Sequence, residues 1–178
     1  MRNYLKLHSA CALSHSALDA VLALGPPPSA EVASVEVETV SNNLKIAQQA
    51  RLNDLSTRFS TPYAVAAAIV HGHTRPEAFV PYERVAELAE RVEVRAADDL
   101  EDAWPDAAPA RVTIRTHDGS YTKRVDNARG HHSNPASPDE LRSKFELLAG
   151  GSGAGRLYER LLGIDEVDDI GTLFEGFA

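Results

Sequence analysis

The chain has 178 residues, a net charge of −8 and one cysteine. A surplus of acidic side chains disfavours a nucleic-acid partner, because phosphate binding needs a basic face. No apolar run approaches the roughly 20 residues of a membrane span, and one cysteine excludes an internal disulfide. We therefore expect a cytoplasmic globular protein with no nucleic-acid partner and no membrane partner.

The first quarter of the chain predicts one helix and one strand. Ser14 is a candidate N-cap, and the helix that follows should end at Gly25 and the prolines behind it. Residues 32–40 alternate between apolar and polar side chains, which indicates a half-exposed strand. Residues 41–57 are polar and poorly periodic, so we expect a long loop with a short helix near residues 46–51.

The middle of the chain contains the most apolar segment. Residues 60–70 are apolar nearly all round, which is typical of a buried helix, and Gly72 should end it. Pro81 is expected to open the next helix. A short strand is predicted at residues 92–96, and the acidic segment 98–109 is predicted to be a loop.

A β-hairpin is the clearest local feature. Residues 110–117 and 120–127 both alternate, and Asp118-Gly119 lies between them. This dipeptide favours a two-residue type I′ turn.

The C-terminal segment has helical signals. Ser137 and Glu140 have the spacing of a capping box, with proline between them at the first helical position. The glycine-rich residues 150–155 should break that helix, and short helices are expected near residues 157–162 and 167–174.

These elements predict an α+β fold. We expect a small, mostly antiparallel sheet with helices on one face, followed by an all-helical C-terminal tail. The sheet domain is placed at residues 1–129 and the tail at residues 130–178. The tail is richer in apolar residues than a short segment needs for itself, so we expect it to dock on another chain or to self-associate.

Several side chains are candidates for chemistry, and each has a structural alternative. Cys11 and His15 could form a nucleophile pair, but they lack the further ligands of a zinc site and could equally be a small buried thiol and a surface histidine. Tyr63 could donate a proton or be a structural tyrosine. Arg58 and Ser60 precede a helix N-terminus, where they could bind an anion, form a surface ion pair or cap the helix.

A loop near residue 130 is the last candidate. His131 belongs to an Arg-Gly-His-His sequence and could titrate near neutral pH, although the surrounding asparagines and prolines fit an ordinary turn equally well. No phosphate loop, dinucleotide fingerprint or nucleophile elbow is present.

Three segments together resemble the lid domain of the MmgE/PrpD family, which includes 2-methylcitrate dehydratase and cis-aconitate decarboxylase. They are Lys6-x4-Cys11-x3-His15-x2-Leu18-Asp19-Ala20, then Arg58-Phe59-Ser60-Thr61-Pro62-Tyr63, and finally Arg129-Gly130-His131 with Asn134-Pro135-x-Ser137-x2-Glu140-Leu141. Each motif alone is weak. Their common order over nearly the whole chain is what makes the resemblance specific.

The resemblance implies a lyase of propionate metabolism that acts on a tricarboxylate or dicarboxylate without metal or cofactor. The residues carried over are Lys6, His15 and Tyr63 as catalytic groups, and Cys11, Arg58, Ser60 and His131 as substrate-binding groups. One branch of the family has histidine at the place of Cys11, and many members have lysine at the place of Arg58. The substrate branch therefore stays open, with a decarboxylase or an epimerase as the alternatives to a dehydratase.

In the family, a large helical domain precedes the lid and supplies further groups to the cleft. Because Met1 stands so close to Lys6, we expect the chain to be inactive without a helical partner chain. It would then be a split subunit, a truncated product or a remnant. The alternative from a different class is a non-catalytic module that binds a carboxylate or a protein.

Overall fold

The computed structural model describes residues 4–25, 27 and 31–175, and the chain divides into two compact units, Met1–Asn134 and Pro135–Ala178. The first unit contains the sheet. Its α-helices are α1 (His15–Leu24), α2 (Thr61–His71), α3 (Glu83–Ala89) and α4 (Asp98–Glu101). Its strands are β1 (Val32–Thr39), β2 (Val92–Ala96), β3 (Ala110–Thr116) and β4 (Ser120–Val125).

The sheet is mixed, in the strand order β2-β1-β3-β4. The β1–β3 and β3–β4 pairs are antiparallel, whereas β1 and β2 are parallel. The α+β class is therefore confirmed, but the sheet is not purely antiparallel. The reason is the connection between β1 and β2, which passes through α2 and α3 and brings the chain back in the same direction.

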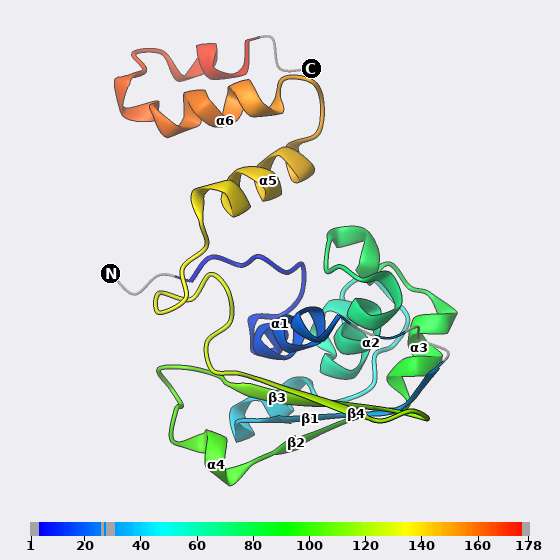
Figure 1. Ribbon diagram of the computed structural model, residues 1–178. Helices are drawn as coiled ribbons and strands as arrows, with labels where there is room; N and C mark the ends of the chain where they lie inside the picture. The colour runs from blue at the N-terminus through cyan, green and yellow to red at the C-terminus, as the bar shows by residue number, and fades with distance from the viewer. Residues whose placement is uncertain (1–3, 26, 28–30, 176–178) are drawn as a thin grey trace. The chain divides into compact units, whose positions relative to one another are not determined.

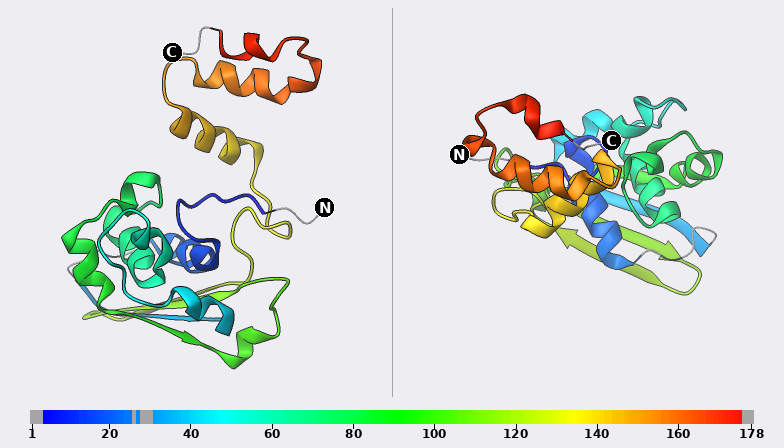
Figure 2. Two further views of the ribbon diagram at one scale, coloured as in Figure 1. Left: turned by 180° about the vertical axis from the view of Figure 1, so that it is seen from behind. Right: turned by 90° about the horizontal axis from the view of Figure 1, so that it is seen from above.

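One face of the sheet is covered by helices. Figures 1 and 2 show α1 and α2 on the same side of the four strands. The inward residues Val35 and Val37 of β1 and Val112 and Ile114 of β3 belong to the core that these helices complete. As predicted, α2 is buried on all sides, since its alanines allow its neighbours to approach closely.

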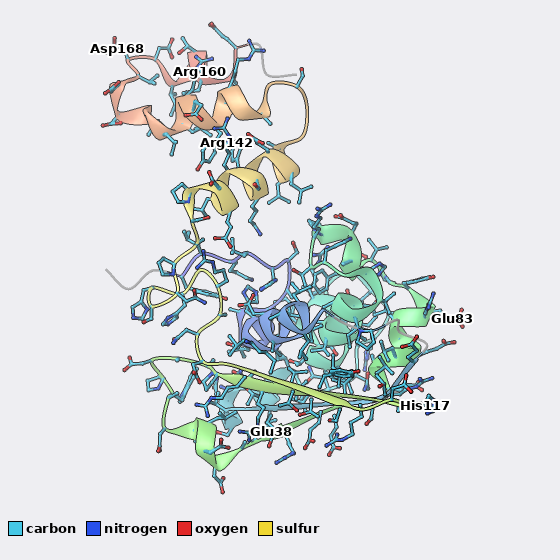
Figure 3. All side chains as sticks on the ribbon, viewed as in Figure 1. Glu38, Glu83, His117, Arg142, Arg160 and Asp168 are labelled. Carbon is cyan, nitrogen blue, oxygen red and sulfur yellow. The ribbon has the colours of Figure 1, made fainter. Side chains whose placement is uncertain are left out.

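Ion pairs cover the opposite face of the sheet. Glu36 and Glu38 alternate with the inward valines of β1, and Figure 3 labels Glu38. Glu38 binds Arg95 of β2 and Arg111 of β3, each at 2.5 Å. Hydrogen bonds from Arg95 and Arg115 lower the pKa of the Glu36 carboxyl. Charged pairs across neighbouring strands make this face polar.

Three local predictions were wrong. Residues 41–57 contain two 3-10 helices, η3 (Ser41–Ile46) and η4 (Ser56–Phe59), in place of a helix near 46–51. Residues 98–109 were predicted to be a loop throughout, but they begin with the short helix α4. The hairpin turn is not type I′, because neither Asp118 nor Gly119 has the positive φ that this turn requires. Instead, the Thr116 amide donates to the Gly119 carbonyl at 2.8 Å.

The second unit is described by itself. Its elements are α5 (Pro138–Ala149), α6 (Ala154–Leu162), η6 (Ile164–Glu166) and η7 (Ile170–Phe174). The predicted capping box at Ser137 and Glu140 is confirmed. Arg142, labelled in Figure 3, binds Glu159 of α6 at 2.5 Å and so joins the two α-helices.

Candidate functional site

Residues 5–11, which precede α1, are held by backbone hydrogen bonds to three other segments of the first unit. The Leu5 amide donates to the Gly130 carbonyl at 3.0 Å, and the Ser9 amide donates to the Thr74 carbonyl at 3.1 Å. The Cys11 amide donates to the Arg58 carbonyl at 2.8 Å. These bonds hold an otherwise extended segment in one place, and with it Lys6 and Cys11.

His15 lies at the start of α1 and is fully buried. Its Nε2 lies 3.1 Å from the Ala10 carbonyl, which can only accept, so Nε2 carries the hydrogen. Its Nδ1 faces the Tyr4 hydroxyl, which donates a hydrogen bond to it. Both ring nitrogens are therefore used within the protein, and the tautomer of His15 is set by its two partners.

Burial sets the protonation of this pair. Desolvation, reinforced by the charge of His8, lowers the pKa of His15 to about 3. Burial also raises the pKa of the Tyr4 hydroxyl above its ordinary value, with smaller contributions from Asp19 and Cys11. At neutral pH the pair is thus a neutral imidazole that accepts a hydrogen bond from a protonated phenol.

A second histidine stands against the first. The His8 and His15 rings make an edge contact with centroids 4.8 Å apart. His8 Nε2 lies 2.9 Å from Asp19 Oδ1, and His8 Nδ1 lies 2.6 Å from the Thr74 hydroxyl. The other oxygen of Asp19 accepts from the Arg129 amide at 2.6 Å. Asp19 therefore connects α1 to the loop after β4.

Tyr4 and His8 were not singled out from the sequence, and Asp19 was quoted without a role. The sequence offered one signal for Asp19. It follows His15 by one helical turn and therefore shares its face of α1. Nothing local indicates that Tyr4 reaches back to this face. The hydrogen bond of the neighbouring Leu5 amide to the Gly130 carbonyl helps to hold it there.

Three further predicted site residues lie around Tyr4 and His15. Lys6 is exposed, and its charge contributes to the lowered pKa of His15. Cys11 is half-buried and contributes to the raised pKa of Tyr4. The ring of His131 lies 6.3 Å from that of Tyr4. The structure therefore brings Lys6, Cys11, His15 and His131 into one region of the first unit.

The Arg58 side chain lies next to this region, and its contacts stabilise the fold. Its guanidinium donates to the Ser9 carbonyl at 2.9 Å and to the Pro76 carbonyl at 3.2 Å, and it lies 5.6 Å from the centre of the Phe79 ring. A cation held by two carbonyls and an aromatic ring stabilises the segment that carries Cys11.

Ser60 and Tyr63 belong to the start of α2. The Ser60 hydroxyl accepts from the Tyr63 amide at 3.2 Å, which is an N-cap, and donates to the Gln48 carbonyl at 2.7 Å. The Tyr63 hydroxyl donates to the Val80 carbonyl at 3.1 Å and accepts from the Tyr82 amide at 3.0 Å. Burial raises the pKa of this hydroxyl. Both side chains therefore find their partners inside the first unit.

Across the described parts of residues 4–175, no three or more His, Cys, Asp or Glu side chains are placed together to hold a metal ion. None of the helices in the same part of the chain has the length and apolarity needed to cross a bilayer.

Comparison with known families decides where the chain belongs. The family model of the MmgE/PrpD C-terminal domain matches residues 8–169. The chain is a member of the MmgE/PrpD family. The resemblance found in its motifs is thereby confirmed, and the match includes Cys11, His15 and His131, whereas Lys6 lies two residues before it. A search of curated proteins found no match.

Membership in the MmgE/PrpD family gives the region around Tyr4 its context. The matched model describes the C-terminal domain of the family. Cys11 and His15 lie near the beginning of the matched domain, and Lys6 precedes it by two residues.

Proposed function

We propose that the chain is the lid part of a metal-independent lyase that resembles 2-methylcitrate dehydratase and acts on a tricarboxylate or dicarboxylate. Membership in the MmgE/PrpD family, together with the grouping of Lys6, Cys11 and His15 in one region, supports this proposal. In this proposal a helical domain supplies the remaining groups of the active site, and the chain by itself turns over no substrate.

Lys6 is the cation proposed to bind a substrate carboxylate, because its side chain is exposed whereas Arg58 donates to backbone carbonyls. His15 acts through Tyr4, since both of its nitrogens are already bonded. Tyr4 stays protonated and donates its hydrogen to His15 Nδ1. The base that removes the proton from carbon is assigned to the helical domain.

Citrate binding tests the role of Lys6. Citrate is expected to shift the amide signals of residues 6–15 in a saturable way, because the ammonium of Lys6 attracts a carboxylate. Lys6→Gln should weaken this binding at least fivefold. Lys123→Gln is the matched control, since Lys123 is an exposed lysine on β4, and it should bind citrate like the wild type. Equal binding by Lys6→Gln and the wild type would exclude Lys6 as the carboxylate site.

Turnover separates the reactions open to the family. The chain is combined with a helical MmgE/PrpD domain and supplied with 2-methylcitrate, and the unsaturated product is measured. Release of carbon dioxide from an unsaturated tricarboxylate would indicate the decarboxylase branch, and epimerisation of an imino acid would indicate the epimerase branch. Citrate binding without turnover in any complex would favour a binding module.

The exposed apolar side chains of the second unit favour a protein partner. The large ones are Leu147, Leu148, Leu162, Ile164, Ile170 and Phe174, whose exposed fractions range from 46 to 65%. Apolar side chains exposed in this number are typical of an interface. We propose that they pack on a helical partner domain or on a second copy of the chain.

Sedimentation tests this interface. The chain should form dimers alone or a complex with the helical domain, and Ile170→Glu should weaken the association at least tenfold because it places a charge in an apolar contact. Leu55→Glu is the control, since Leu55 is 68% exposed but belongs to the first unit. A monomer at high concentration, both alone and in the mixture, would contradict the proposal.

A further inference from the structure

The β3–β4 hairpin turns at His117 and Asp118, and Figure 3 labels His117 in this turn. The Thr116 amide donates to the Gly119 carbonyl at 2.8 Å, so these two residues close the turn. The Asp118 amide donates to the Thr116 hydroxyl at 3.3 Å. Asp118 and Gly119 are both exposed, and they therefore lie together at the tip of an ordered loop.

The dipeptide at this tip is unique in the sequence. Asp118 is the only aspartate or asparagine of the chain that glycine follows. In any aspartyl peptide, the backbone nitrogen of the next residue can reach the side-chain carboxyl carbon and close a five-membered ring. A side chain on that next residue crowds the approach of the nitrogen, and glycine has no Cβ to do so. Asp118 is therefore the position in the chain where such a ring closes most easily.

The Gly119 amide is not used to close the turn. The closing bond runs from the Thr116 amide to the Gly119 carbonyl, whereas the Gly119 amide donates to no residue that the structure describes. A Cβ at Gly119 would meet nothing within 4 Å, so the space around this amide is open. Within the described part of the chain, no side chain binds the Asp118 carboxylate. Both reacting groups are thus available on the surface.

We propose that Asp118 is a modification site at which aspartate converts to isoaspartate through a succinimide. The Gly119 nitrogen attacks Cγ of Asp118, and the new C–N bond closes the five-membered ring. One carboxylate oxygen leaves as water, together with the amide hydrogen and one proton from the solvent.

Water then opens the succinimide ring in one of two ways. Attack at Cγ restores aspartate. Attack at the backbone carbonyl of Asp118 leaves the peptide bond running through Cβ and Cγ, which is isoaspartate. The water that is lost in the first step is regained in the second, so the net reaction is an isomerisation that needs no other reactant.

Isoaspartate adds one methylene group to the backbone of the turn. The turn is closed at present by the 2.8 Å bond between Thr116 and Gly119, so the longer backbone must open it or rearrange it. The change is confined to the tip beside β4, which is an edge strand of the sheet. Exposed loop tips accommodate such a change without unfolding the domain. The inference does not depend on the proposed lyase function.

Storage of the folded full-length chain at neutral pH tests the proposal. Isoaspartate is measured by mapping the tryptic peptide that begins at Thr116 and ends at Lys123, and by enzymatic methylation of isoaspartyl carboxylates with labelled S-adenosylmethionine. Isoaspartate at Asp118 should exceed that at any other aspartate at least tenfold. Its absence from the folded chain would overturn the proposal, and its formation only in urea would show that the turn protects Asp118.

Variants identify the attacking nitrogen. Gly119→Val should slow the isomerisation at least tenfold, and a side chain fits there because the φ of Gly119 is not positive. Ser120→Val is the matched control, since it makes a valine one residue later on β4, and it should react like the wild type. Asp118→Asn should form the succinimide at least fivefold faster, because ammonia leaves more readily. Circular dichroism and thermal unfolding confirm that the variants are folded. Equal rates for Gly119→Val and the wild type would exclude attack by the Gly119 nitrogen.

Discussion

Gly130→Ala is expected to lower the free energy of unfolding by about 2–4 kcal/mol. Gly130 has a φ of +95°, and a Cβ there would lie 2.0 Å from the backbone oxygen of Leu5. Backbone cannot move aside as a flexible side chain can, so the N-terminal segment must be displaced. The same segment carries Tyr4 and Lys6, and citrate binding should weaken in parallel.

Urea unfolding measures this effect, and Gly72→Ala is the matched control. Gly72 also has a positive φ, +69°, but a Cβ there would meet nothing within 4 Å. Its substitution should therefore cost only the conformational strain, about 1–2 kcal/mol. An equal loss of stability in both variants would contradict the prediction. It would show that the close contact of Gly130 with Leu5 does not add to the cost of the substitution.

Acidification is expected to destabilise the first unit through His15. Its pKa is lowered from 6.5 in the unfolded chain to about 3 in the folded one, mainly by burial. Below pH 6.5 the unfolded state binds a proton that the folded state does not. The contribution of His15 to the free energy of unfolding therefore decreases as the pH is lowered. The loss is about 1.4 kcal/mol per pH unit between pH 6 and pH 4 and ends near the folded pKa.

The measurement is the free energy of unfolding at several pH values, compared between the wild type and His15→Gln. The variant should show a slope that is smaller by about 1.4 kcal/mol per pH unit, since glutamine does not titrate. His8, Lys6, Asp19 and Tyr4 face His15 and remain in both proteins. His117→Gln, at the exposed hairpin tip, should keep the wild-type slope. Equal slopes for the wild type and His15→Gln would show that His15 is not held neutral by burial.

Elements specified by neighbouring residues could be predicted. The apolar run of α2, the ends of α1 and α2 at Gly25 and Gly72, and the capping box of α5 each depend on side chains within a few positions of one another. Alternation likewise predicted β1 and the β3–β4 hairpin. The type I′ turn was wrong because the dipeptide Asp118-Gly119 permits that turn without requiring it.

The candidate site could be predicted only in its residue types. The motifs named Lys6, Cys11 and His15, and the family match includes Cys11 and His15. Whether a side chain can bind a ligand depends on its hydrogen bonds to backbone groups that are distant in the sequence. The Tyr63 hydroxyl is taken by Val80 and Tyr82, which no local pattern around α2 indicates.

The sequence by itself therefore determined the family, the α+β class and the elements whose signals are local. Tertiary structure alone decided the parallel pairing of β1 with β2, the bond of Asp19 to the Arg129 amide and the contact of Leu5 with Gly130. The physical reason is that these contacts join residues far apart in the chain. Their partners are mostly backbone groups, which every residue carries and no sequence pattern marks.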